Sequence, residues 1–289
     1  MPAQLIINAD DFGASSEINS AIAMAHREGI LTSASLMVAQ RSALEAVSIA
    51  KDNPGLATGL HITLSNGLSA LSADKIPALV DSDNRFRHTP ESAGLIYYMN
   101  RQAKRQLRLE IEAQFEKFME TGLQLSHIDG HQHLHAHPTV LPIIVELAKK
   151  FGASGIRVPQ DPFIANMKAD RSRIGTKIIV ALGHAYLAGV CRRYLHNSKL
   201  VRCERVIGSL MSGRMNTDYV IRMLRQVKAD RIEVFFHPSL SSGSDSQGPN
   251  KGDLEALLDP ALKQFIDQGD YELTTYPGLE AKERGGECI

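Results

Sequence analysis

The sequence has no tryptophan and only three cysteines in 289 residues. Cys191, Cys203 and Cys288 cannot all pair within one chain, and no CxxC occurs, so neither a disulfide framework nor a thiolate zinc cluster is indicated. Unpaired thiols favour a reducing compartment. The N-terminus enters a strand-like run without the charged region of a signal peptide. We therefore expect a cytoplasmic protein.

An excess of charge of either sign is also missing. Lys plus Arg and Asp plus Glu both total 32, which gives a formal net charge of zero. Because no overall field attracts nucleic acid or an acidic membrane, we expect no nucleic-acid partner. The longest apolar stretch, 178–191, is interrupted by Gly183 and His184 and is too short to span a bilayer, so it predicts a buried helix.

Short β-branched runs alternate with longer segments whose apolar residues recur at steps of three or four, as in amphipathic helices. This alternation predicts an α/β fold in which about eight parallel strands close an irregular, TIM-like (β/α) barrel. An open doubly wound sheet is the alternative, but no glycine-rich phosphate loop follows the first strand. The predicted strands are 5–10, 31–38, 57–64, 125–130, 155–158, 205–210, 231–237 and 271–275. The predicted helices are 16–28, 42–52, 101–120, 138–151, 176–195, 217–229 and 253–268.

We expect one domain over residues 1–289, because the sequence shows neither an internal repeat nor a linker. Two segments interrupt the alternation. Residues 66–100 form a long insertion, and loops of this length are usually functional or mobile. Residues 239–252 are rich in Gly and Ser and follow His237 directly, which predicts a flexible lid or a disordered surface loop.

An acidic pair, Asp10 and Asp11, ends the first predicted strand. Adjacent carboxylates repel each other unless a cation offsets the repulsion, and a cation also separates their roles into one ligand and one free base. Neighbouring strand residues point in opposite directions, so both carboxylates can face one site only where the strand gives way to a loop, as Gly13 suggests. Capping of the following helix is the alternative.

Five of the eleven histidines lie between His127 and His137, at alternate positions that also include Asp129. In an extended chain these side chains would project from one face. Metal ligation would give the imidazoles partners, and a ligating imidazole commonly donates its second N–H to a carboxylate such as Asp129. One strand end can supply only one or two ligands, which leaves the other histidines for substrate or solvent. A surface histidine tract is the alternative.

Three more candidates end other predicted strands. His61 alone would be read as a core histidine, but it falls at the place that corresponds to the acidic pair. His237 can donate a proton to a leaving group, because imidazole titrates near neutral pH. Arg157 offers a fixed cation to a substrate or an oxyanion, or else a structural ion pair. In (β/α) barrels the active site lies at the carboxyl ends of the strands, where all these groups fall.

Four segments resemble the YdjC-like carbohydrate deacetylase family in that family's order and over nearly the whole chain. They read NADDFG at 8–13, GLHITL at 59–64, HIDGHQHLHAHP at 127–138 and FFHP at 235–238. Further segments, ILTSASLMV at 30–38, LVDSDNRF at 79–86 and GIRVP at 155–159, are similar to the hopanoid-biosynthesis-associated branch called HpnK. One departure is Gly130, where many relatives carry another residue.

The resemblance implies an irregular (β/α) barrel that hydrolyses the N-acetyl group of an acetylated amino sugar. It implies a divalent ion held by Asp11, His61 and His131. It also assigns Asp10 as the general base and His237 as the general acid. One carboxylate and two imidazoles suit zinc, cobalt or iron, whereas members of the family have been associated with magnesium, so the metal stays open.

For the substrate side, we expect contacts from Arg157, Asp129 and His133. The HpnK branch implies the N-acetylglucosaminyl headgroup of a hopanoid lipid, and a chito-oligosaccharide is a second candidate. A lipid substrate would bring the protein to a membrane, where Arg171, Arg173, Arg192 and Arg193, on either side of the apolar run of 176–195, could make a peripheral contact. A homodimer is also considered. The alternatives are an inactive relative that binds metal or lipid, and a hydrolase of another amide or ester.

Overall fold

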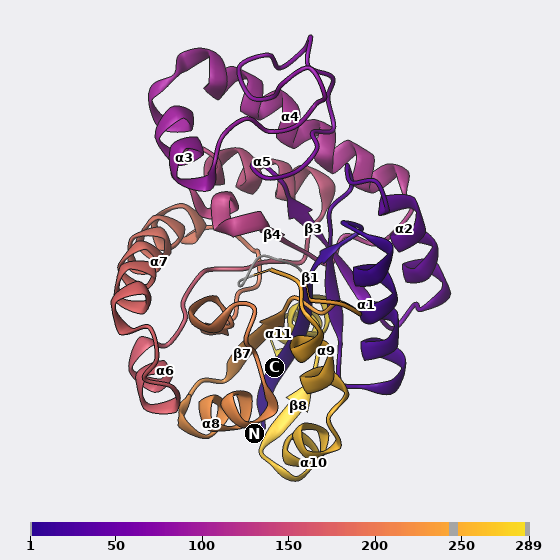
Figure 1. The fold of residues 1–289 in the computed structure, drawn as a ribbon, viewed down its shortest axis with the longest axis vertical. Coiled ribbons are helices and arrows are strands. Elements are labelled where there is room, and N and C mark those ends of the chain that lie inside the picture. The colour runs from indigo at the N-terminus through magenta and orange to yellow at the C-terminus, as the bar shows by residue number, and fades with distance from the viewer. Residues whose placement is uncertain (1, 243–247, 287–289) are drawn as a thin grey trace.

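The computed structural model describes residues 2–242 and 248–286, and it shows a curled sheet surrounded by helices (Figure 1). All eight predicted strands are present. Their bounds are β1 Ala3–Phe12, β2 Ser33–Leu36, β3 Ala57–Ile62, β4 His127–Gly130, β5 Gly155–Ile156, β6 Arg205–Ile207, β7 Arg231–Phe236 and β8 Tyr271–Leu273. The predicted α/β class is confirmed.

Strand β1 pairs with three other strands, β2, β7 and β8. The strand order is β5-β4-β3-β2-β1-β7-β6, with β8 paired to the beginning of β1, and all the pairs are parallel. Leu5, Ile6 and Ile7 are fully buried, as expected of a strand that is covered on both faces. Because the strands are parallel, the carboxyl ends of β1, β3, β4 and β7 meet at one edge of the sheet.

The helices pack outside this sheet, and the seven predicted ones are found. The helices are α1 Ser16–Glu28, α2 Ala43–Asp52, α3 Pro90–Met99, α4 Arg101–Glu120, α5 Leu141–Phe151, α6 Phe163–Ala169, α7 Ile174–Leu195, α8 Thr217–Gln226, α9 Lys251–Leu258, α10 Pro260–Gln268 and α11 Tyr276–Gly286. The predicted helix 253–268 is divided into α9 and α10 because Pro260 cannot continue a helix, and Asp259 caps α10 instead. Helices α3, α6 and α11 were not predicted.

The insertion 66–100 is folded. Two antiparallel bridges, Leu68 with Arg85 and Val80 with Phe86, hold its first part together, and α3 follows. The Tyr97 hydroxyl donates to the backbone oxygen of Leu64 at 2.6 Å, which ties α3 to the end of β3. The other interrupting segment is 239–252, which was predicted to be a flexible lid or a surface loop. Residues 243–247 of it lie outside the described residues, and α9 begins within the segment, at Lys251.

The expectation that the apolar stretch 178–191 is a buried helix is wrong. Only 17% of the apolar window of α7 is buried, although the helix is long and apolar enough, by length and composition, to cross a membrane. Its buried side chains are Lys177, Ala188, Cys191 and Leu195. Apolar residues occur all around α7, so its sequence could not show that only one side packs against the protein.

Strands β5 and β6 end the strand order and do not pair with each other within the described residues. Loop contacts join them instead. The Val206 N–H donates to the Gln160 carbonyl at 3.3 Å, and Asp161 Oδ2 accepts the N–H groups of Gly208 and Leu210 at 3.2 and 3.0 Å. Burial raises the pKa of Asp161 to about 6, although these N–H groups oppose the rise.

Replacing Asp161 with Asn tests this contact. The pKa of Asp161 rises from 3.8 to about 6 on folding, so the folded protein binds more protons in that interval and its free energy of unfolding falls as pH rises through it. Asn keeps an oxygen acceptor for both N–H groups but carries no charge. We expect wild type to lose stability relative to Asp161→Asn between about pH 4 and pH 6, as measured by urea denaturation. If the free energies of unfolding of wild type and Asp161→Asn changed equally with pH, the raised pKa of Asp161 would be contradicted.

Candidate active site

A cavity of about 680 Å³ opens at the carboxyl ends of the strands. Six of the eight site residues predicted from the sequence line it, namely Asp10, Asp11, His61, His131, His133 and His237. Arg157 and Asp129 do not line the cavity and are fully buried behind it. The structure therefore separates the predicted set into a group facing the cavity and a pair that supports this group.

A bulge in β1 turns both carboxylates of the acidic pair toward the cavity. The register between β1 and β2 shifts between Ala9 and Phe12, and Asp11 adopts a φ of 63°. A left-handed conformation is uncommon outside glycine, and Asp is among the residues that tolerate it best. The expectation that a loop begins at this pair is wrong, because β1 continues to Phe12 and the bulge within it achieves the same orientation.

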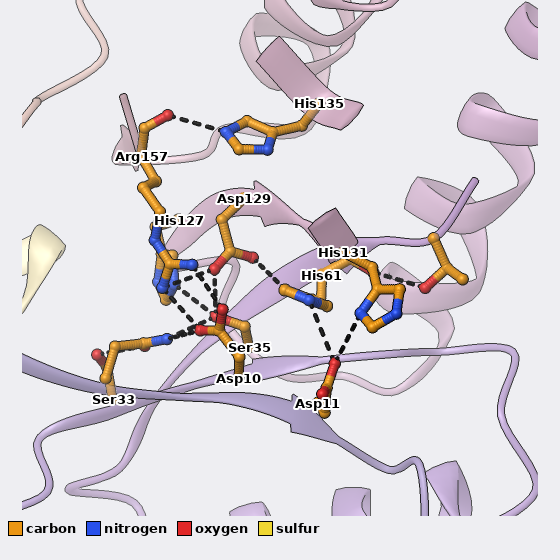
Figure 2. Close-up of polar contacts among 12 residues, drawn as sticks. Asp10, Asp11, Ser33, Ser35, His61, His127, Asp129, His131, His135 and Arg157 are labelled. Carbon is orange, nitrogen blue, oxygen red and sulfur yellow. Dashed lines mark hydrogen bonds and ion pairs between the residues drawn. The ribbon is translucent and has the colours of Figure 1, made fainter. Parts of the chain in front are cut away.

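The imidazoles of His61 and His131 both approach Asp11 (Figure 2). His131 Nδ1 lies 3.0 Å and His61 Nε2 lies 3.5 Å from Asp11 Oδ1. The possible ligand atoms of the three residues all lie within 4.8 Å of one another. Burial alone would raise the pKa of Asp11, but His131, His237 and His61 together bring it well below its ordinary value. An anionic Asp11 is the form that binds a cation.

Asp129 orients His61. Its Oδ1 lies 2.7 Å from His61 Nδ1, which turns the other ring nitrogen, Nε2, toward Asp11. Burial would lower the pKa of His61, but Asp129, Asp10 and Asp11 raise it to about 9. The same negative potential that favours a proton on His61 favours a metal cation at Nε2. A carboxylate behind a ligating histidine is the usual outer partner in metal sites.

The residues present fit a divalent cation. One carboxylate and two imidazoles that face a cavity leave coordination positions open, as catalytic sites require. A second grouping, Asp10, His61 and Asp129, also has its ligand atoms within 4.8 Å, but Asp10 and Asp129 already bind Arg157. The grouping that contains Asp11 is therefore the better fit for a cation, because its carboxylate does not bind Arg157.

Arg157 follows β5 and binds three carboxylates (Figure 2 shows two of them). Its Nη1 and Nη2 each donate to an oxygen of Asp10 at 2.7 Å. Nη2 also lies 2.9 Å from Asp129 Oδ2 and 2.8 Å from Glu233 Oε1. Burial would lower the pKa of Arg157, but these carboxylates raise it well above its ordinary value. The guanidinium is thus a fixed cation that holds Asp10 in one orientation.

The prediction that the histidines of 127–137 project from one face of an extended chain is wrong for the residues after Gly130. Strand β4 ends there, and the chain turns into a 3-10 helix, η1 His131–Ala136, with Gln132 and His133 at positive φ. The turn packs His135 against Gly130, where an added Cβ would lie 2.9 Å from His135 Cβ, so a larger residue would need a different turn. The imidazoles therefore diverge, and only those of His131 and His133 line the cavity.

Several residues of the site had no predicted role. His184 of α7 lines the cavity and meets the His133 ring edge-on, with the ring centroids 4.9 Å apart, and Ser209 Oγ lies 3.2 Å from His133 Nε2. Pro90 and Glu91 of α3 form another part of the wall. Glu233 supports Arg157, and a glutamate within the apolar run of β7 was a signal that could have identified it.

The parallel strands, the carboxylate and the two imidazoles describe an α/β protein whose strand ends could hold a metal ion. The YdjC-like protein family matches residues 4–268, and the chain belongs to this family. Proteins named carbohydrate deacetylase are 37% identical in Geobacillus stearothermophilus and 32% identical in Brevibacillus brevis; each alignment covers 96% of this chain and 98% or 99% of the relative. A crystal structure from Enterococcus faecalis, 22% identical, has a TM-score of 0.74 over 96% of this chain and 99% of that one, which shows the shared fold.

Close packing under the site explains the glycine of the GLH segment. His127 lies flat against Tyr276, with ring centroids 4.8 Å apart, and its Nε2 lies 3.1 Å from Ser35 Oγ. A Cβ on Gly59 would lie 2.4 Å from His127 Cε1. The ring is fully buried and held on two sides, so it cannot move away cheaply.

Gly59→Ala should therefore destabilise the protein by about 1–3 kcal/mol, the usual cost of overpacking a core. The matched control is Gly183→Ala in the middle of α7, where an added Cβ meets nothing within 4 Å. In that helix alanine should stabilise by about 0.5–1 kcal/mol. Thermal denaturation of both variants measures the difference, and equal melting temperatures would show that His127 is not confined as described.

Proposed function

We propose that this protein is a metal-dependent carbohydrate N-deacetylase, which hydrolyses the acetamide of an acetylated amino sugar to acetate and a free amine. The observation that carries the proposal is the convergence of Asp11, His61 and His131 beside Asp10 and His237 in one cavity. Relatives named carbohydrate deacetylase support the reaction class. We further propose a single domain folded as an irregular (β/α) barrel, with residues 66–100 beside the cavity.

Asp11, His61 and His131 would hold the ion. A divalent ion bound there supplies polarisation of the acetyl carbonyl and a lowered pKa of a bound water. Asp129 keeps Nε2 of His61 available by accepting from Nδ1. Zinc matches the donor set best, and magnesium stays a candidate.

Asp10 is our candidate for the general base. Arg157 fixes its carboxylate with two hydrogen bonds, and Asn8 donates a third to Oδ1 at 2.9 Å. A carboxylate has about four acceptor positions, so Asp10 can still take the proton of the attacking water. This support gives Arg157 a positioning role, in place of the substrate contact expected from the sequence.

His237 is our candidate for the general acid. Its Nε2 lies 3.9 Å from Asp10 Oδ2, and its backbone N–H donates to Asp253 Oδ2 at 2.8 Å, which fixes the turn after β7. It would give a proton to the amine nitrogen as the C–N bond breaks, while Asp10 accepts one from water. His133, with Ser209 behind it, would contact the sugar.

Acetate release from metal-loaded protein tests the reaction class. The substrates to compare are those expected from the sequence resemblance, a chito-oligosaccharide and an N-acetylglucosaminyl lipid, and mass spectrometry should show the loss of one acetyl group. Removing the ion with a chelator should abolish turnover, and adding back a divalent metal should restore it. Activity that survives complete metal removal would contradict metal dependence, and no acetate from any N-acetyl sugar would favour an inactive relative or another hydrolase.

Two neighbouring substitutions separate the base from the ligand. Asp10→Asn should lower kcat by about 10²–10⁴-fold, the usual contribution of general acid–base catalysis, while the protein still binds one ion. Asp11→Asn should lower the bound metal itself, because it removes the anionic ligand. Metal analysis and acetate release on the same samples measure both effects. Full activity in Asp10→Asn would remove Asp10 from the base role.

A further inference from the structure

Helix α7 exposes a continuous apolar face. Ile174, Ile178, Leu182 and Tyr186 follow one another at four-residue steps, and Leu182 and Tyr186 are 68% and 62% exposed. Ile179, beside this row, is 73% exposed. Single exposed apolar residues are ordinary on protein surfaces, but a contiguous patch of this kind marks an interaction site.

Helix α3 extends the same kind of surface on the other side of the cavity. Its Leu95, Tyr98 and Met99 are all more than half exposed. Both helices also form the wall of the cavity, α3 through Pro90 and α7 through Val180. In Figure 1, α3 lies above α7 on the left side of the molecule, and the 3-10 helix η1 contacts both. We call the exposed apolar residues of α3 and α7, named in this and the preceding paragraph, the rim face.

The charge around α7 is strongly one-sided, although the whole chain is neutral. Residues 162–203 contain one acidic residue, Asp170, and Lys177 already pairs with it. The basic residues in the same stretch are Lys168, Arg171, Arg173, Lys177, Arg192, Arg193, Lys199 and Arg202. The arginines at 171, 173, 192 and 193 are exposed at the two ends of the apolar row.

A second cavity, of about 760 Å³, lies between α6 and α7. Its lining includes apolar side chains such as Ile164 and Ala185 and the cationic side chains of Lys168 and Arg192. A lining of apolar and cationic side chains suits a ligand that joins an apolar chain to an anionic group, as a phospholipid does.

We infer that the rim face binds the surface of an anionic phospholipid membrane. Apolar side chains can enter the boundary between headgroups and acyl chains, Tyr98 and Tyr186 suit that boundary, and the arginines can bind lipid phosphates. A second copy of the chain is a poorer occupant, because a two-fold interface would set this basic stretch against itself. Helix α7 would lie along the membrane and not across it, because Ala188, Cys191 and Leu195 pack into the protein.

Sedimentation with vesicles tests this inference without turnover. Wild-type protein should bind vesicles of phosphatidylglycerol and phosphatidylcholine at low salt, bind pure phosphatidylcholine more weakly, and dissociate as salt rises. Leu182→Glu should reduce binding to the vesicles by roughly tenfold or more, because the transfer of a leucine side chain from water into the membrane no longer contributes to binding. The matched control is Leu44→Glu, because Leu44 is 86% exposed. It belongs to α2, which lies on the opposite side of the molecule from α7 in Figure 1.

The outcomes are distinct. Loss of binding in Leu182→Glu with full binding in Leu44→Glu supports the inference. Absence of binding at low salt overturns it, as does equal binding by both variants. A dimer in analytical ultracentrifugation that Leu182→Glu dissociates also overturns it, since a second copy would then cover the rim face. Acetate release from a water-soluble substrate should not change in either variant, so failure here is separable from failure of the proposed reaction.

Discussion

The guanidinium of Arg157 is the interaction on which the rest of the site depends. It lies fully buried and binds a carboxylate from each of three strands, Asp10 of β1, Asp129 of β4 and Glu233 of β7. Removing one partner of a buried ion pair commonly costs about 3–5 kcal/mol, because the other charge is left uncompensated. The network thus joins strands that are far apart in the sequence. It also sets the orientation of Asp10 directly and that of His61 through Asp129.

This arrangement leaves more negative charge than one arginine can balance. Asp10, Asp11, Asp129 and Glu233 are all buried around Arg157 and His61, and burial raises the pKa of Glu233 even with Arg157 beside it. Asp11 is additionally held at a positive φ. Residues in such conformations persist only where their surroundings hold them, and they gather at functional sites. A cation between Asp11 and the two imidazoles would offset this charge, so we expect the stability of the strand ends to be coupled to cation binding.

The sequence predicted what depends on local pattern. The strands were found because their apolar runs are short and separated by amphipathic helices. The gathering of the candidate site residues at one edge followed from their places at the ends of parallel strands, whereas the choice of Asp11, His61 and His131 among them came from the resemblance to the YdjC-like family. Other features depend on contacts between distant segments. The turn at Gly130 depends on the packing of His135, the burial of Arg157 depends on carboxylates from three strands, and the exposure of α7 depends on which side of it meets the protein. No local periodicity contains that information.

The cavity combines two kinds of element. Its chemical groups stand at or just beyond the ends of paired strands, whereas part of its wall comes from α3 and α7, outside the sheet. Rigid strand ends suit groups that must keep their separations within tenths of an ångström. Helices that pack against the protein on one side only can change in sequence without disturbing those separations. The substrate and the surface that the protein binds can therefore change while the reaction stays the same. His184 connects the two kinds of element, because it belongs to α7 and contacts His133, two residues beyond the histidine that approaches Asp11.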